Sequence, residues 1–247
     1  MGVFHGKRII YNAEELITAG YTDDGVYSLA IYNENVSEYE LQDVYCLLDD
    51  QWDGGGWMLA MKATRGTTFS YNSNYWTTDN TLNPTGLNRD DEDAKFDLFN
   101  NFPATDIMAI WPDIPDSGGS ISGAESWTWL QEDFNNGTPK ALTNFFSSVD
   151  KQYISDAKLF DGWKAGVFSS QAGFRWYGFN YNRPGSSDSS VRWGFGWNNE
   201  TTEGSNDVGG GVGLSTRWDS FSAGDHINCC QDTLGINRSA RVEIYVR

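Results

Sequence analysis

Residues 53–57 read Asp53-Gly-Gly-Gly-Trp57, and this glycine run organises the start of the chain. Consecutive glycines permit backbone conformations that other residues resist, so we expect a tight turn with Trp57 buried after it. A strand is predicted over 58–62. Upstream, residues 25–32 alternate sides as a strand does, and 43–48 is an apolar run of strand length.

A short helix is predicted before these strands, over residues 12–20. Asn12 is a favourable N-cap, Glu15 follows three residues later as in a capping box, and Gly20 ends the segment. Residues 64–94 are instead rich in Thr, Asn, Ser and Asp, with few periodic apolar residues. Such composition predicts a long ordered surface loop.

The rest of the chain mixes helical and strand patterns. Ser122-Gly-Ala-Glu125 matches a capping box, and the apolar residues after it predict a helix that Gly137 ends. A second helix is predicted over 138–146. Strands are predicted over three further segments: 172–181, 191–197 and 240–247.

No repeat, heptad pattern or linker interrupts the sequence. We therefore expect one α+β domain over residues 1–247, with mixed and antiparallel sheets and short helices. Within it, 1–62 forms a strand-rich subregion, and 63–247 forms a larger subregion that is rich in loops.

The chain is strongly acidic, with 34 Asp and Glu against 17 Lys and Arg and a formal net charge of -17. Nucleic acid is not an expected partner, because binding it requires clustered cations that displace its counterions. The mean hydropathy of -0.52 and the short apolar runs predict no membrane insertion. The excess acid fits either surface solvation or carboxylates that bind divalent cations.

The three cysteines, Cys46, Cys229 and Cys230, do not form a disulfide framework. Adjacent cysteines bridge only through a strained ring, so we expect reduced thiols. The first residues lack the apolar core of a secretory signal. These features predict synthesis in a cytoplasm without a signal peptide.

No arrangement for covalent or acid–base catalysis is visible in the sequence. The only histidines are His5 and His226, and neither a nucleophile elbow nor a zinc spacing occurs. We therefore predict a protein that is not an enzyme. A carboxylate pair for glycoside hydrolysis stays an alternative, because the separation of two acids in space cannot be read from a sequence.

The opening segments carry a family resemblance. Residues 17–29, then Val44-Tyr-Cys46, then Asp53-Gly-Gly-Gly-Trp57, follow the order and spacing that open a fibrinogen-related domain. The chain resembles this family most strongly over its first 60 residues. The first cysteine of the family's opening disulfide is missing, which leaves Cys46 unpaired.

The later segments are similar to the intelectin branch of that family. This similarity is carried by the stretches 90–98, 104–111, Ala172-Gly-Phe-Arg175, Asn198-Asn-Glu200, Gly209-Gly-Gly211, Gly224-Asp-His226 and 242–247. Intelectins are calcium-dependent lectins. The resemblance therefore implies carbohydrate recognition through a cation that loop oxygens hold and that binds a vicinal diol of the sugar.

The resemblance also implies site residues. Asn198 and Glu200 match the start of the calcium-ligand loop, while Trp218 and His226 match positions near the sugar. The sequence departs from the family in three places. Thr201 replaces a histidine, no acid lies between Gly211 and Asp219 where the family has a glutamate ligand, and the rim tyrosine falls on Cys229.

Two acidic clusters are candidates for calcium. Glu203 and Asp207 lie with Asn198 and Glu200 on a segment rich in Gly, Ser and Asn, and there we favour calcium. For the second cluster, a solvated loop and a structural calcium site are equally good interpretations; it comprises Asp90, Asp91 and Asp93.

Four tryptophans have two interpretations each. Most are expected in the core, and one or two on loops would stack on sugar rings. They are Trp76, Trp193, Trp197 and Trp218.

Two functional classes follow. The first is a recognition module that binds cell-surface carbohydrate with calcium, displayed on a virion or an extracellular surface for host attachment. The second is a structural or decorating virion component, such as part of a phage appendage, which uses the same fold without sugar binding. We expect a homo-oligomer or an assembly with other virion proteins, formed through the domain's own surface because no coiled-coil stalk is present.

Overall fold

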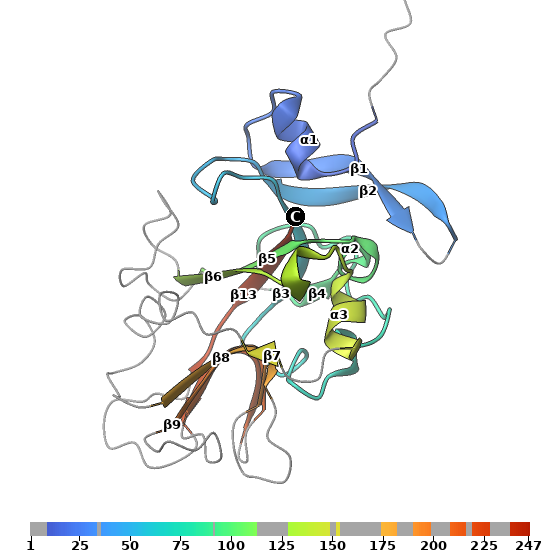
Figure 1. Ribbon diagram of the computed structural model, residues 1–247. Coiled ribbons are helices and arrows are strands. Elements are labelled where there is room, and N and C mark those ends of the chain that lie inside the picture. The colour runs from blue at the N-terminus through green and yellow to red at the C-terminus, as the bar shows by residue number, and fades with distance from the viewer. Residues whose placement is uncertain are drawn as a thin grey trace, which may run out of the picture.

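The computed structural model describes ten stretches of the chain: 9–33, 36–90, 92–112, 128–148, 152–153, 174–181, 190–198, 208–215, 219–227 and 238–247. They form a mixed α+β structure with two sheets and a few short helices (Figure 1). Every pairing between the described strands is antiparallel.

The first sheet has seven strands in the order β1-β2-β3-β13-β5-β6, with β4 paired to β3. Its strands are β1 (Gly25–Asn33), β2 (Glu38–Leu47), β3 (Trp57–Ala63), β4 (Ala94–Lys95), β5 (Asp106–Trp111), β6 (Thr128–Asp133) and β13 (Val242–Val246). The C-terminal strand β13 therefore lies in the middle of a sheet that the N-terminal strands begin.

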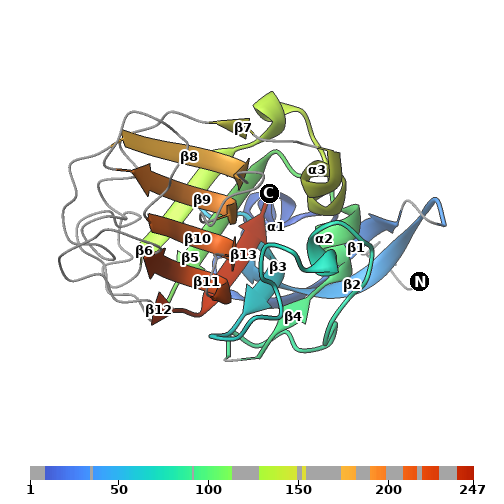
Figure 2. The same cartoon turned by 90° about the horizontal axis from the view of Figure 1, so that it is seen from below.

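The second sheet has six strands, which lie side by side in the order β12-β11-β10-β9-β8-β7 (Figure 2). They are β7 (Gln152–Tyr153), β8 (Phe174–Tyr181), β9 (Ser190–Asn198), β10 (Val208–Ser215), β11 (Ser220–Ile227) and β12 (Arg238–Ser239). The glycine run 209–213 lies within β10, where Gly211 faces Gly194 of β9. A Cβ on Gly211 would lie 2.2 Å from the carbonyl oxygen of Trp193, so the close approach of the strands requires glycine.

The predicted N-terminal helix is confirmed as α1 (Ala13–Thr18). The Asn12 side chain accepts a hydrogen bond from the Glu15 amide at 2.9 Å, while the Glu15 carboxylate accepts one from the Tyr11 amide at 3.1 Å. These bonds satisfy amides that a helix start leaves unpaired. The predicted strands at 25–32, 43–48 and 58–62 are likewise confirmed, as parts of β1, β2 and β3.

The glycine turn contacts the C-terminal residue of the chain. Residues 53–56 all have positive φ, between 53° and 83°, and a Cβ on Gly55 would lie 2.4 Å from the Leu48 carbonyl oxygen. Trp57 is fully buried, and the Arg247 guanidinium lies 4.1 Å from its ring centre. Arg247 also pairs with Asp53 at 2.9 Å and donates to the Gly55 carbonyl at 3.1 Å. The last residue thus fixes the turn against the first sheet.

The helix predicted from the capping box at residues 122–125 is wrong where the structure describes it. Residues 128–133 form β6, which pairs with β5 in a continuous register from Asp106↔Asp133 to Trp111↔Thr128. Pairing with a strand about twenty residues away outweighs a local helix signal. Gly137 ends the 3₁₀ turn η2 (Asn135–Gly137) instead of an α-helix, and residues 122–127 lie outside the described residues.

The second predicted helix forms, but it is displaced along the chain. Helix α3 spans Leu142–Ser148 in place of 138–146 and buries Phe145 and Phe146. The three predicted late strands are confirmed apart from their ends, as β8, β9 and β13, whereas β10 and β11 were not predicted. The polar segment 64–94 is mostly loop, with one 3₁₀ turn, η1 (Asn74–Trp76), and a short helix, α2 (Asp97–Asn101), follows it.

One buried apolar cluster contains residues of both sheets. It includes Trp57 and Ile244 from the first sheet and Phe179 and Trp193 from the second. The aromatic rings of α3 lie within it, with Phe145 4.9 Å from Phe179, ring centre to ring centre. In the described parts of the chain, no helix has the length and apolar character needed to cross a membrane.

Candidate functional site

Asp90, one of the predicted calcium ligands, contacts a buried cation of the protein itself. Lys62 on β3 is fully buried, and its ammonium group contacts the Asp90 carboxylate and donates to the Asn88 carbonyl at 2.7 Å. The hydrogen bond from Lys62 lowers the pKa of Asp90. A calcium ion at Asp90 would therefore have to compete with a fixed ammonium group.

Asp93, from the same acidic cluster, holds the polar loop to the end of β3. Its carboxylate accepts hydrogen bonds from the Thr64 amide at 2.7 Å, from the Thr64 hydroxyl at 3.1 Å and from the Thr68 hydroxyl. Asp91 lies outside the described residues. Among the described residues, no group of three His, Cys, Asp or Glu side chains gathers to hold a metal.

The second set of predicted ligands is located by the strands that lead to it. Asn198 is the last residue of β9, and β10 begins at Val208, which pairs with both Trp197 and Ile227. The end of β9, the start of β10 and the end of β11 therefore meet at one edge of the second sheet. His226 reaches this edge on β11, opposite Gly209.

Several predicted residues of this site cannot be placed further. The side chains of Asn198 and His226 lie outside what the structure describes, as do whole residues in the adjoining segments: Glu200, Thr201, Glu203, Asp207, Trp218 and Cys229. Trp218 follows Ser215, which pairs with Ser220 at the opposite end of the strands. The length of β10 separates the two ends by roughly 20 Å. The backbone thus places Asn198 and His226 at one end of these strands. The segment that contains Trp218 starts at the other end.

The two predicted tryptophans whose side chains the structure describes lie in the core. Trp76 and Trp193 are both buried. The indole of Trp76 donates to the Phe69 and Ser70 carbonyls, each at 3.0 Å, and that of Trp193 donates to the Tyr177 hydroxyl at 3.0 Å. These two side chains serve packing. The side chain of Trp197 lies outside the described residues.

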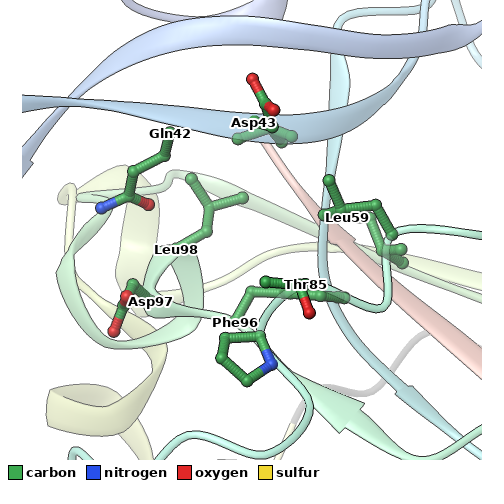
Figure 3. A pocket seen from close by; sticks show the side chains of 10 residues that line it. Gln42, Asp43, Leu59, Thr85, Phe96, Asp97 and Leu98 are labelled. Carbon is green, nitrogen blue, oxygen red and sulfur yellow. The ribbon is translucent and has the colours of Figure 1, made fainter.

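A cavity that the sequence did not indicate lies between β2, β3 and the loop before α2. It measures about 350 Å³, within the range of small-ligand sites. Leu59, Phe96 and Leu98 contribute apolar surface to its lining. Figure 3 shows the Gln42 amide extending from β2 toward Asp97, whereas the Asp43 carboxylate points away.

Asp97 gives the cavity a titratable group. Burial is the main cause of its raised pKa, and the nearby charge of Glu40 raises it further. With the Gln42 amide and the Thr85 hydroxyl, the cavity presents a few polar groups over an apolar surface. These residues are separated by up to 56 positions in sequence and follow no motif. No pattern in the sequence therefore indicates that they lie together.

Two further polar groups are fully enclosed and structural. Glu243 on β13 is buried between Arg89 and Arg241, and accepts a hydrogen bond from the Tyr245 hydroxyl at 2.8 Å. Lys95 on β4 is buried, donates to the Thr78 carbonyl at 2.6 Å, and has its pKa lowered by burial to about 8. A lysine without exposed surface offers no access to a substrate.

No known family model matches the chain, and no curated protein is significantly similar to it.

Proposed function

We propose that this chain is a non-enzymatic recognition module of the fibrinogen-related, intelectin-like kind, which binds cell-surface carbohydrate through calcium. One support is a contact between two segments that carry the resemblance, one near the start of the chain and one at its C-terminus. The 53–57 turn and the C-terminal Arg247 are in direct contact, with the arginine over Trp57. This contact is expected when the whole sequence forms one domain built around that turn.

The observation that carries the proposal is the meeting of three strand ends. Asn198 at the end of β9, the start of β10 at Val208 and the end of β11 at Ile227 share one edge of the second sheet. The acid-bearing segment 199–207 connects two of these ends. Calcium takes six to eight oxygen ligands, among them the carboxylate and amide oxygens that the residue types of this segment carry.

The internal contacts of the other acidic cluster sharpen the assignment. Asp90 already faces the Lys62 ammonium, and Asp93 already accepts hydrogen bonds from Thr64 and Thr68. We therefore assign calcium to the segment that carries Asn198, Glu200, Glu203 and Asp207. In this assignment His226 lies beside the sugar.

Calcium titration calorimetry tests this assignment. The double variant Asn198→Ala/Glu200→Ala should weaken calcium binding at least about tenfold, because each lost oxygen ligand removes direct coordination. The control Asp90→Asn, which removes an acid from the other cluster, should leave the calcium affinity unchanged. Unchanged binding in the double variant, or loss of binding in the control, would move the site elsewhere.

A structural or decorating virion component is the second candidate function. The observation that favours it is an exposed apolar face on β1 and β2, far along the chain from the proposed sugar site. In this case the module would be built into a virion through contacts with other structural proteins. Its presence in purified virions, or its absence from them, distinguishes a virion component from a free extracellular lectin.

A further inference from the structure

The hairpin of β1 and β2 carries an unusual concentration of exposed apolar side chains. Eight large apolar residues are strongly exposed among those whose side chains the structure describes, and all eight lie between residues 9 and 41. Leu41 is 78% exposed and Tyr39 is 61% exposed. Single exposed apolar residues are ordinary, but a contiguous group of them marks an interaction site.

The strand register shows that four of these side chains share one face. Tyr32 pairs with Tyr39, Ala30 with Leu41 and Val26 with Tyr45, and paired residues project to the same side of a sheet. The opposite side carries Leu29, Ile31, Val44 and Cys46, which are buried in the core. We call the outward side, with Val26, Tyr32, Tyr39 and Leu41, the hairpin outer face.

Aromatic contacts extend this face beyond the two strands. The ring of Tyr39 lies 5.3 Å from that of Tyr32 and 5.0 Å from that of Tyr11, which precedes α1, measured between ring centres. All three tyrosines remain exposed. Three touching rings beside Leu41 form a continuous aromatic surface, the type of surface that is enriched at protein interfaces.

The charge of this hairpin is negative. Residues 9–61 contain eleven Asp and Glu and no Lys or Arg. Asp43 pairs with Ser28 and lies on the same side of β2 as Tyr39 and Leu41, whereas the exposed Glu38 and Glu40 alternate with them and lie on the other side. The hairpin outer face therefore combines apolar rings with the Asp43 carboxylate, in a segment whose charged side chains are all acidic.

This charge argues against a second copy of the chain as the occupant. Pairing two such faces would bring like charges together, which costs free energy at an interface. Cations elsewhere in the described structure are engaged internally, such as Lys62 with Asp90, Arg241 with Glu243, and Arg247 with Asp53. The negative charge of the hairpin likewise disfavours an anionic lipid surface.

We propose that the hairpin outer face binds a protein partner whose surface presents arginines among apolar side chains. A guanidinium group stacks on tyrosine rings and pairs with carboxylates at the same time, so the side of β2 that carries Tyr39, Leu41 and Asp43 suits it. Leu41 and Tyr32 supply apolar area for the centre of the contact. The site is independent of the proposed calcium site, which lies on the other sheet.

Fluorescence anisotropy with a labelled twelve-residue peptide of alternating arginine and leucine tests the proposal. The wild-type protein should bind it saturably, and a peptide with glutamate in place of arginine should not bind. Tyr39→Ser/Leu41→Ser should weaken binding at least about tenfold although the charge is unchanged, because central apolar residues dominate interface affinity. Asp43→Asn should also weaken binding, because it removes the carboxylate of this face.

A matched control removes the same charge elsewhere. Asp50→Asn, at an exposed acid outside the face, should change the affinity less than about twofold. Equal binding by wild type and Tyr39→Ser/Leu41→Ser would overturn the proposal, because attraction would then depend on charge alone. Wild-type binding to a neutral oligosaccharide that this variant loses would assign the face to sugar instead.

Two measurements complete the test. Sedimentation of the wild type should show no self-association that Tyr39→Ser/Leu41→Ser abolishes, since such a result would make a second copy the occupant. Calcium affinity should be the same in this variant and the wild type. The hairpin proposal and the calcium proposal therefore fail separately.

Discussion

Carboxylates in two regions of this molecule have opposite surroundings. Around β13 and the loop before β4, acids pair with cations of the protein: the buried Glu243 lies between Arg89 and Arg241, and Asp90 contacts the buried Lys62. In the β1–β2 hairpin, Glu38 and Glu40 are exposed within a segment that has no basic residue. The first region uses charge to hold the fold together. The second region directs its charge outward, where a partner can meet it.

The largest effect is expected at the buried acid. Glu243→Ala leaves two guanidinium groups without their carboxylate, and breaking a buried pair in this way should lower the free energy of unfolding by about 3–5 kcal/mol. Urea unfolding measures this change. Glu243→Gln, which keeps the shape of the side chain, should lose less. A loss below about 1 kcal/mol for the alanine variant would show that this cluster does not hold the fold.

The glycine turn between β2 and β3 provides the next test. Gly55→Ala should cost about 3 kcal/mol, because its Cβ would meet the Leu48 carbonyl and its φ is +74°. Gly54→Ala is the matched control: its φ is +82°, but no atom lies within 4 Å of an added Cβ. It should cost only about 1 kcal/mol. Equal losses in thermal or urea unfolding would mean that backbone strain, not the close approach, restricts Gly55.

The buried Lys95 should make the free energy of unfolding depend on pH. Its folded-state pKa of about 8 lies below the ordinary 10.5, so between these values the unfolded chain binds more protons than the folded one. The stability that this group contributes should therefore rise with pH across this window, by about 2 kcal/mol relative to Lys95→Met. Unfolding free energies at several pH values measure it. A constant difference between the two proteins would contradict the lowered pKa.

The smallest effect is expected on the hairpin. Glu38→Gln/Glu40→Gln should change the free energy of unfolding by less than about 0.5 kcal/mol, because both acids are exposed. The same urea titration that measures Glu243→Ala gives this value. A loss comparable to that of Glu243→Ala would remove the contrast between the two regions.

The sequence predicted the first 62 residues well because their signals are local. Asn12 with Glu15, the alternation in 25–32 and the three glycines before Trp57 each act over a few residues. It failed at residues 128–133, where a partner strand about twenty residues away decides the structure. Trp127 and Trp129, two residues apart, have the period of a strand, whereas the capping box at 122–125 favours a helix.

The candidate sites were less predictable than the fold. The acids at 90 and 93 looked like metal ligands because Lys62 and Thr64, their partners, lie more than 25 residues earlier. The hairpin outer face was also missed, because Tyr39 and Leu41 match the alternation of any half-buried strand. Only the register and the exposed fractions distinguish an interface from a core at these positions.

Calcium-dependent sugar recognition is tested most directly by glycan-array binding of the purified protein, first with calcium and then with a chelator. We expect saturable binding to cell-surface glycans that the chelator abolishes and that Asn198→Ala/Glu200→Ala lacks. Binding that survives the chelator, or no binding by a well-folded protein in either condition, would contradict a calcium-dependent lectin.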